Sequence, residues 1–395
     1  MERNGKQSYL ERIYGRYRKA TKEQKQKILN EFCEVCGYHR KHAIRLLKKR
    51  PRRNTQEPRL PVGRKPVYQI PEITEPLKRV WMASDYLCGK RLKAALPEWL
   101  PHYAQEHGAL EPSVYNALLK MSAASIDRVL KPVKAKHKGK GLSGTKPGTL
   151  LKNQIPIKTH HWDVTQPGFL EADTVAHCGN SLAGDFVWSL TMTDILTTWT
   201  ECRATWNKGS QGVCTQVNHI EKSLPFPLKG FDCDNGSEFL NHHFVRYFSD
   251  RPPEKSVQFT RSRPYHKDDN AHVEQKNWTH VRQCFGYDRF DNPLLVDLMN
   301  DLYANEWSLY QNHFCPSNKL IEKTKINSKY RRKYDQPQTP YHRVLACQSV
   351  EKQTKENLIK LHNSLNPFKL KAAIENKLKI IFEHVKVTSN VRQRI

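Results

Sequence analysis

The sequence predicts a mixed α/β domain that follows basic helical segments and precedes a basic C-terminal region. The 395 residues are enough for two or three domains, each with its own core. Apolar positions recur at helical spacing in the stretches before Leu130. From Gly168 onward, β-branched and aromatic runs alternate with helix-like stretches. These two patterns separate an all-helical first part from an α/β second part.

The charge of the chain restricts its partners. It carries 66 Lys and Arg against 39 Asp and Glu, a formal net charge of +27. Such an excess points to a polyanionic partner, most commonly nucleic acid, although a ribosome-associated protein or a solubilising surface gives the same balance. Residues 1–19 lack an apolar signal region, and no run of about 20 apolar residues predicts a membrane span. The ten cysteines are scattered, so we expect a reducing, cytoplasmic and nucleoid-associated setting.

Residues 1–60 are expected to form a helix-turn-helix DNA-binding module. Thr21 and Gln24 have the spacing of a capping box that opens a helix, and Gly37 ends that helix. The inward positions are Ile28, Leu29, Phe32 and Val35 in the first helix and Ala43, Ile44 and Leu47 in the second. A basic second helix is typical of DNA-binding helix-turn-helix proteins, although any helical hairpin with a polar face looks similar. The expected DNA contacts are Arg40, Lys41, Arg45, Lys48 and Lys49.

Cysteine and histidine alternate near the turn of this module, in Cys33-x₂-Cys36-x₂-His39-x₂-His42. These residue types suit zinc, but four ligands within ten residues leave too little chain for a usual finger. We favour the helix-turn-helix interpretation, and the sequence alone does not decide whether zinc binds.

Residues 68–131 form a second helical block, and residues 132–160 a basic linker. The apolar stripe of the block consists of Val114, Ala117, Leu118 and Met121. Ser122 is placed to cap a helix that presents Arg128, a further expected DNA contact. A second helix-turn-helix and a plain helical bundle fit this pattern equally well. Between Lys131 and Gln154 there are seven lysines and no acid, a composition that cannot bury a core and suits contact with phosphates.

Residues 161–320 predict the α/β domain. Three strands in succession and then an alternation of helix and strand indicate a mixed five-stranded sheet flanked by helices. The expected strands are Phe169–Val175, Phe186–Thr193, Thr198–Ala204, Leu228–Cys233 and Val257–Thr260. The expected helices are Gln211–Leu224, Phe239–Phe248 and Asp269–Phe285.

Three acidic residues occupy positions in this domain where carboxylates bind ligands. Asp173 lies inside the first strand, where alternation puts Glu171, Asp173 and Val175 on one face. A carboxylate within an apolar strand must be paired, hydrogen-bonded or bound to metal. Asp234 follows the fourth strand, and strand ends of open α/β sheets are where ligands gather.

Glu274 is the third acid, on the last predicted helix. Helical spacing puts Asn270, Glu274, Asn277 or Trp278, and Val281 on one face, which would turn a carboxylate and an amide toward the sheet. Three carboxylates on two strands and a packed helix suit a pair of Mg²⁺ ions, which prefer oxygen ligands. Two such ions about 3.5–4 Å apart promote an in-line phosphoryl displacement.

The acids and their flanking motifs resemble the catalytic core of the retroviral-integrase superfamily, and most closely the DDE transposases of bacterial insertion sequences. The resemblance covers roughly residues 160–320 and rests on Asp173, the string Asp234-Asn-Gly-Ser-Glu-Phe239, and Glu274 within Asp269-Asn-Ala-His-Val-Glu-Gln-Lys-Asn277. It implies an RNase H-like fold with Asp173, Asp234 and Glu274 as catalytic ligands of two Mg²⁺ ions, with Mn²⁺ as a possible substitute. It also implies cleavage at the ends of a mobile element and transfer of the 3′-hydroxyl into target DNA.

Several further residues acquire expected roles from the resemblance. Asn235 and Asn270 are expected to support the ligands, although turn and N-cap duties are equally open. Asp232 alternates with Asp234 and is its substitute on the same strand face. The expected DNA contacts in and after the core are Lys276, Arg331, Arg332 and Lys333, the last three in a basic C-terminal region spanning residues 321–395.

The tail from Glu351 to Ile395 predicts two amphipathic helices separated by Pro367. They suit either subunit contacts in a homo-oligomer assembled on paired DNA ends or a cap on the core of one chain. Two alternative functions remain beside the transposase, namely a non-catalytic sequence-specific DNA-binding protein and an RNase H-like nuclease that cleaves without joining. The terminal repeat, the target preference, the number of subunits and the copy or excision route cannot be read from the sequence.

Overall fold

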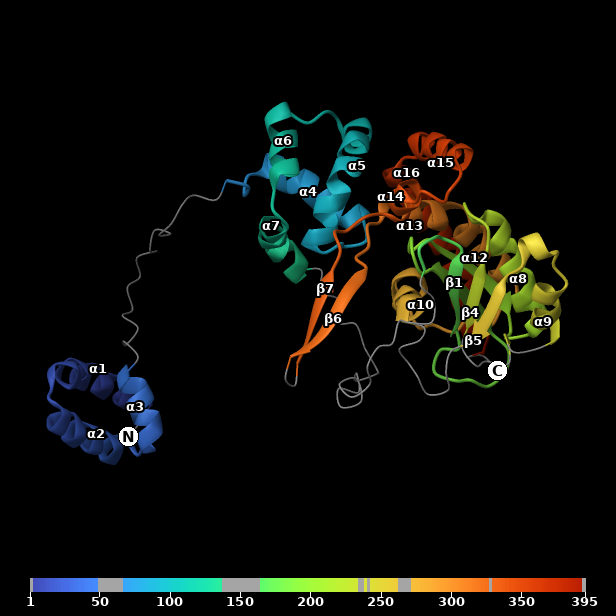
Figure 1. The fold of residues 1–395 in the computed structure, drawn as a ribbon. Coiled ribbons are helices and arrows are strands. Elements are labelled where there is room, and N and C mark those ends of the chain that lie inside the picture. The colour runs from blue at the N-terminus through green and yellow to red at the C-terminus, as the bar shows by residue number, and fades with distance from the viewer. Residues whose placement is uncertain are drawn as a thin grey trace. The chain divides into compact units, whose positions relative to one another are not determined.

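The computed structural model describes residues 3–48, 67–136, 164–233, 238–239, 242–261, 271–326 and 329–392. The chain divides into two compact units, Met1–Pro66 and Val67–Ile395. Figure 1 shows the elements of both. The described part contains no helix that is long and apolar enough to cross a membrane.

The first unit is a three-helix arrangement, of which two helices were predicted. Its helices are α1 (Arg3–Lys19), α2 (Lys22–Cys36) and α3 (Arg40–Lys48). The predicted capping box at Thr21 and Gln24 is confirmed, and Gly37 ends α2 with a φ of 64°, a left-handed conformation that glycine adopts without strain. The inward position of Val35 was wrong: its side chain is 44% exposed, and Cys36 is buried instead.

The basic residues of α3 lie on its outer side. Lys41, Arg45 and Lys48 are exposed, and the Arg40 guanidinium donates a hydrogen bond to Asn30. Lys49 lies outside the described residues.

The second unit begins with a helical block that shares its core with the α/β part. Its helices are α4 (Pro71–Ala83), α5 (Gly89–His107), α6 (Pro112–Lys120) and α7 (Ala123–Lys136). The Ser122 hydroxyl accepts a hydrogen bond from the Ser125 amide at the start of α7, as predicted, and Arg128 is exposed. Residues of this block belong to one hydrophobic cluster with residues of the later helices.

The predicted mixed five-stranded sheet flanked by helices is confirmed. The strands are β1 (Phe169–Ala176), β2 (Val187–Asp194), β3 (Thr200–Trp206), β4 (Gly230–Cys233) and β5 (Gln258–Arg261). They are arranged in the order β3-β2-β1-β4-β5, with β1 antiparallel to β2 and parallel to β4. Strand β1 is therefore central, and the chain crosses from the antiparallel half to the parallel half of the sheet beside it.

Helices cover both faces of this sheet. On one face, apolar residues of β1, β2 and β4 pack with α8 (Ser210–Ser223) and α9 (His242–Ser249). On the other face lies a helix that runs from Ala271 to Phe285 as α10 (Ala271–Lys276), a π-helical segment (Asn277–Arg282) and α11 (Gln283–Phe285). A second interrupted helix on that side comprises α12 (Leu294–Leu302), a π-helical segment (Tyr303–Trp307) and α13 (Ser308–Phe314). Beyond the sheet, Pro253–Lys255 form one 3-10 turn.

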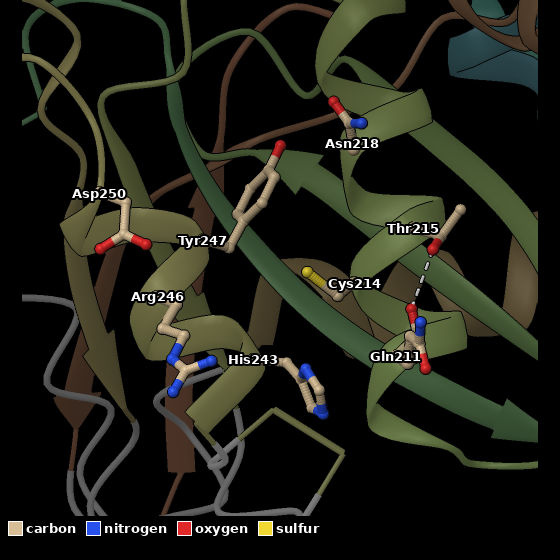
Figure 2. Close-up of a pocket in the computed structure, with 8 residues that line it drawn as sticks. All are labelled: Gln211, Cys214, Thr215, Asn218, His243, Arg246, Tyr247 and Asp250. Atoms are coloured by element: carbon tan, nitrogen blue, oxygen red, sulfur yellow. Dashed lines mark hydrogen bonds between the residues drawn. The ribbon is translucent and has the colours of Figure 1, made fainter.

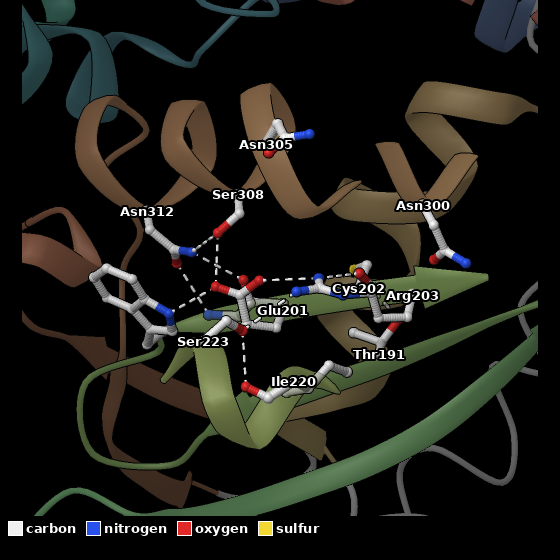
Figure 3. Close-up of polar contacts among 12 residues, drawn as sticks. Thr191, Glu201, Cys202, Arg203, Ile220, Ser223, Asn300, Asn305, Ser308 and Asn312 are labelled. Atoms are coloured by element: carbon white, nitrogen blue, oxygen red, sulfur yellow. Dashed lines mark hydrogen bonds and ion pairs between the residues drawn. The ribbon is translucent and has the colours of Figure 1, made fainter. Parts of the chain in front are cut away.

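Polar contacts attach α12 and α13 to the edge strand β3 (Figure 3). The side-chain amide of Asn312 pairs with the backbone of Thr200, with both hydrogen bonds at 3.0 Å. That of Asn300 pairs with the backbone of Ala204. These amides satisfy edge-strand groups that would otherwise be available to another strand. On β3, between Thr200 and Ala204, the buried carboxylate of Glu201 lies 3.3 Å from the Arg203 guanidinium.

The C-terminal region contributes a hairpin and three helices. The hairpin consists of β6 (Leu320–Ile326) and β7 (Lys329–Tyr334), and it was not predicted. The helices are α14 (Pro340–Ala346), α15 (Lys352–Ser364) and α16 (Pro367–Arg392), and Pro367 separates the last two as predicted.

The apolar stripe of α16 is used within the chain. Ile374 and Ile381 are buried in the same cluster as residues of α4, α5, α12 and α13. Of the two roles left open for the tail, capping the core is therefore the one that this helix fulfils.

Candidate active site

The candidate active site lies on the face of the sheet that is covered by α10. The apolar residues Leu170 and Ala172 of β1 belong to the cluster under α8 and α9. Strand alternation therefore turns the intervening Glu171 and Asp173 toward the opposite face, as the sequence predicted. The register places Asp232 of β4 beside Glu171, on that same face.

Asp173 is held in place by its own strand and by the helix above it. Its Oδ1 accepts a hydrogen bond from the Thr174 amide at 2.7 Å, and its Oδ2 accepts one from the Asn277 side-chain amide at 2.6 Å. Asn277 is three residues after Glu274 on the same continuous helix. The amide that was expected to face the sheet therefore does so, and it fixes this helix directly above Asp173.

Glu171 attaches the start of that helix to the same strand. Its Oε2 accepts hydrogen bonds from the backbone amides of His272 at 2.9 Å and Val273 at 3.0 Å, in the first turn of α10. The side chain is only 3% exposed, and this burial raises its pKa to about 8, with Asp232 and Glu274 contributing repulsion. A carboxyl group at the N-terminus of a helix satisfies amides that have no partner within the helix. Glu171 thus positions the Glu274 helix.

Glu274 lies at the surface of this helix, one residue after Val273, whose amide donates to Glu171. Of the two alternatives, Asn277 and Trp278, that helical spacing put on the face toward the sheet, Trp278 is not buried: its side chain is 51% exposed, whereas Val273 and Val281 are buried. The reason is the π-helical segment that begins at Asn277, which changes the angular spacing of the residues after it.

The second acid, Asp234, lies outside the described residues, as do Asn235 and Asn270. The strand that leads to it is described. Its last register pair joins Ala172 to Cys233, each one residue before an expected ligand. Asp232, the substitute for Asp234, accepts a hydrogen bond from the Thr260 hydroxyl at 2.6 Å.

The donor set suits a hard cation, since it consists of carboxylate oxygens. Among the residues that the structure describes, no three acidic, histidine or cysteine side chains form a group that could hold a metal ion. This includes Cys33, Cys36, His39 and His42. The proposed triad depends on Asp234 for its third member.

Lys276 is a correction to the expected DNA contacts. Its side chain is only 9% exposed, and burial lowers its pKa to about 7, with Arg91 and Arg343 contributing repulsion. A side chain enclosed in this way is not available on the outer surface of the helix. By contrast, Arg331, Arg332 and Lys333 are exposed on β7.

Three side chains around the site make contacts that were not predicted from the sequence. Glu171 accepts the helix amides, Asn277 donates to Asp173, and the buried Glu238 links the loop after β4 to β1. It accepts a hydrogen bond from the Thr174 hydroxyl at 3.0 Å and pairs with Lys208 at 2.6 Å. Strand alternation predicted the face on which Glu171 lies, but nothing in the sequence identifies the two backbone amides from which it accepts hydrogen bonds.

A pocket of about 440 Å³ lies between α8 and α9 (Figure 2). It is lined by polar residues, among them Asn218, Arg246 and Asp250. Since α8 and α9 cover the face of the sheet opposite to Asp173, this pocket is separate from the acidic site.

Comparison with known proteins defines the family of the chain but not its activity. No model of a known protein family matches it. The chain is 39% identical over 338 residues to the uncharacterized protein y4rM of Sinorhizobium fredii, an alignment that covers 85% of this chain and 93% of y4rM. The chain belongs to the same family as y4rM. Among solved structures, the catalytic core domain of BIV integrase matches with 12% identity and a TM-score of 0.27, over 44% of this chain and 91% of that domain.

Proposed function

We propose that this chain is a DNA transposase whose active site consists of Asp173, Asp234 and Glu274. The observation that carries the proposal is the attachment of the Glu274 helix to β1. Asn277 binds Asp173, and Glu171 binds the first turn of the helix. These interactions hold a helix that bears one predicted ligand directly above a strand that bears another.

The sheet supports the inclusion of Asp234. Strand β4 is the parallel neighbour of β1 and ends one residue before Asp234 in the sequence. The carboxyl end of a strand next to the change from antiparallel to parallel pairing is where open sheets bind ligands. The motif resemblance of residues 234–239 and 269–277 agrees with this assignment.

The proposed reaction is phosphoryl transfer in two steps. A water molecule attacks a phosphodiester at the end of the element, and the 3′-oxygen leaves and takes up a proton. The freed 3′-hydroxyl then attacks a phosphodiester of target DNA and displaces its 3′-oxygen, so no covalent intermediate with the protein is needed.

Two Mg²⁺ ions held by the three carboxylates would activate the attacking oxygen and stabilise the leaving one. The residues of the chain mainly orient the groups. Asn277 orients the Asp173 carboxylate through its Oδ2, and Glu171 attaches the first turn of the helix to the same strand. Basic residues outside the site hold the DNA, as the net charge of +27 favours.

The test is a cleavage and joining assay with purified chain, Mg²⁺ or Mn²⁺, and duplexes made from the DNA on both sides of the gene. We expect nicked and joined products from the wild type, and neither product from Asp173→Asn or Glu274→Gln. Asp250→Asn is the matched control, because Asp250 is an exposed acid at the end of α9 on the other side of the sheet. It should retain both activities.

Two results would contradict the proposal. Cleavage that survives Asp173→Asn would exclude the acidic site as its source. Binding to these duplexes without any metal-dependent product would favour the non-catalytic DNA-binding protein.

A further inference from the structure

The β6–β7 hairpin forms a two-stranded arm whose strands pair only with each other (Figure 1). The side chains that the structure describes in this hairpin do not build a core. Ile321 is 61% exposed and Tyr334 is 51% exposed, and Arg331, Arg332 and Lys333 are also exposed. A two-stranded hairpin without a covering layer is only marginally stable in water. An arm of this kind is suited to acquire its covering layer from a partner.

The charge of the arm identifies the partner. Residues 319–334 contain seven Lys and Arg and one acid, Glu322. On β7, Arg331, Arg332 and Lys333 follow one another and are all exposed. Like charges so close in sequence repel one another. A polyanion bound to the arm would remove this repulsion.

The base of the arm is fixed to the main unit. Asp335, directly after β7, accepts a hydrogen bond from the Lys319 amide at 2.6 Å and forms an ion pair with the Arg343 guanidinium, also at 2.6 Å. Arg343 belongs to α14 and also donates to the Ser317 carbonyl at 3.0 Å. The two ends of the hairpin are therefore tied to each other and to the main unit, while the described side chains beyond them remain exposed.

The dimensions of the arm favour one kind of binding site. Seven residues of strand span roughly 20 Å. The major groove of DNA, about 12 Å wide, admits a two-stranded ribbon, whereas the minor groove, about 6 Å wide, must first be widened at a cost in DNA deformation. We infer that the β6–β7 hairpin binds duplex DNA by entering its major groove. This inference rests on the proposed function and adds the element that grips the DNA.

The test compares two double variants that each remove two exposed positive charges. Arg331→Ala with Arg332→Ala changes the arm, where neither side chain has a hydrogen bond or ion pair with another described residue. Lys352→Ala with Lys360→Ala changes exposed residues of α15 and is the matched control. Binding to a random 40-bp duplex is measured over a range of salt concentrations without divalent ions, so that the result does not depend on cleavage.

We expect the arm variant to bind more weakly. The plot of log K against log[salt] should become less steep, its slope smaller in magnitude by about 2, because each arginine that is removed leaves one phosphate without its positive partner. The control should keep the wild-type slope. Methylation of guanine N7, which lies in the major groove, should be blocked by the wild type and restored in part by the arm variant at saturation.

Three results would overturn the inference. An unchanged slope for the arm variant would exclude the arm from the DNA interface and leave the proposed catalytic site untouched. A reduced slope with unchanged N7 protection would place the arm outside the major groove, along the backbone or in the minor groove. Tighter binding to single-stranded DNA or RNA of the same length would assign the arm another partner.

Discussion

Glu171 offers the sharpest test of how the site is held together, because a positioning role and a metal-binding role predict opposite behaviour for one conservative change. Both backbone hydrogen bonds from α10 reach the same atom, Oε2. Glutamine has one carbonyl oxygen in the same place and no charge. If Glu171 acts only as an acceptor for these amides, Glu171→Gln should preserve the site, and Glu171→Ala should not.

The expected magnitude follows from burial. Glu171 is 3% exposed, so its removal leaves the amides of His272 and Val273 without their acceptor in a place where water has little access. A buried donor without a partner costs about 1–3 kcal/mol, and the loss of an N-cap costs about 0.5–2 kcal/mol. We therefore expect Glu171→Ala to lower the free energy of unfolding by about 2–4 kcal/mol and Glu171→Gln to lower it by less than about 1 kcal/mol.

Three measurements check this reasoning. Urea denaturation gives the free energies, hydrogen exchange reports the opening of the His272 and Val273 amides, and strand cleavage reports the position of Glu274. Glu171→Ala should accelerate exchange at both amides and reduce cleavage, and Glu171→Gln should change neither greatly. Equal loss of cleavage in the two variants, with slow exchange retained in Glu171→Gln, would show that the charge of Glu171 is needed and would refute the positioning role.

The other predictions concern the support of the fold. Arg203→Met should lower the free energy of unfolding by about 3–5 kcal/mol, because it leaves the buried Glu201 carboxylate without its ion pair. Urea denaturation measures this, and an unfolding free energy equal to that of the wild type would contradict it. Hydrogen bonds from two histidines hold the pKa of Glu98 well below its ordinary value of 4.5. The ionised carboxylate therefore stabilises the fold above pH 4.5, and this contribution should be lost as the pH falls below 4.5. The free energy of unfolding, measured at a series of pH values, should fall less steeply in acid for Glu98→Gln than for the wild type. An equally steep fall would exclude this carboxylate as the cause. Thr21→Ala removes the cap of α2 and should destabilise the first unit by about 0.5–2 kcal/mol in thermal unfolding, whereas an unchanged midpoint would show that the capping box contributes nothing.

Local patterns were sufficient to predict most of the main elements. Period-two alternation and β-branched residues placed all five strands of the central sheet, and the capping box at Thr21 marked the start of α2. Alternation also put Glu171 and Asp173 on one face. Each of these features is determined by residues that are close in sequence, which explains why they could be recognised without coordinates.

The features that were missed depend on packing between distant segments. The π-helical segment that begins at Asn277 interrupts the regular helical periodicity, and Trp278 is exposed. No residue pattern near Asn277 predicts this segment. Lys276 is buried because elements from other parts of the chain enclose it, with Arg91 and Arg343 nearby. The β6–β7 hairpin was missed because its many lysine and arginine residues give no alternation of apolar and polar positions and were interpreted as a basic tail.

The central claim is that Asp173, Asp234 and Glu274 converge on a shared cation site, and iron-mediated cleavage of the polypeptide tests it directly. Fe²⁺ that replaces Mg²⁺ produces hydroxyl radicals in the presence of ascorbate and peroxide, and these cut the backbone only near the bound ion. We predict cuts close to all three residues in the same chain, suppressed together by excess Mg²⁺ and abolished together by Asp173→Asn. Cuts near only one of the three, or cuts that Mg²⁺ does not suppress, would contradict a common site.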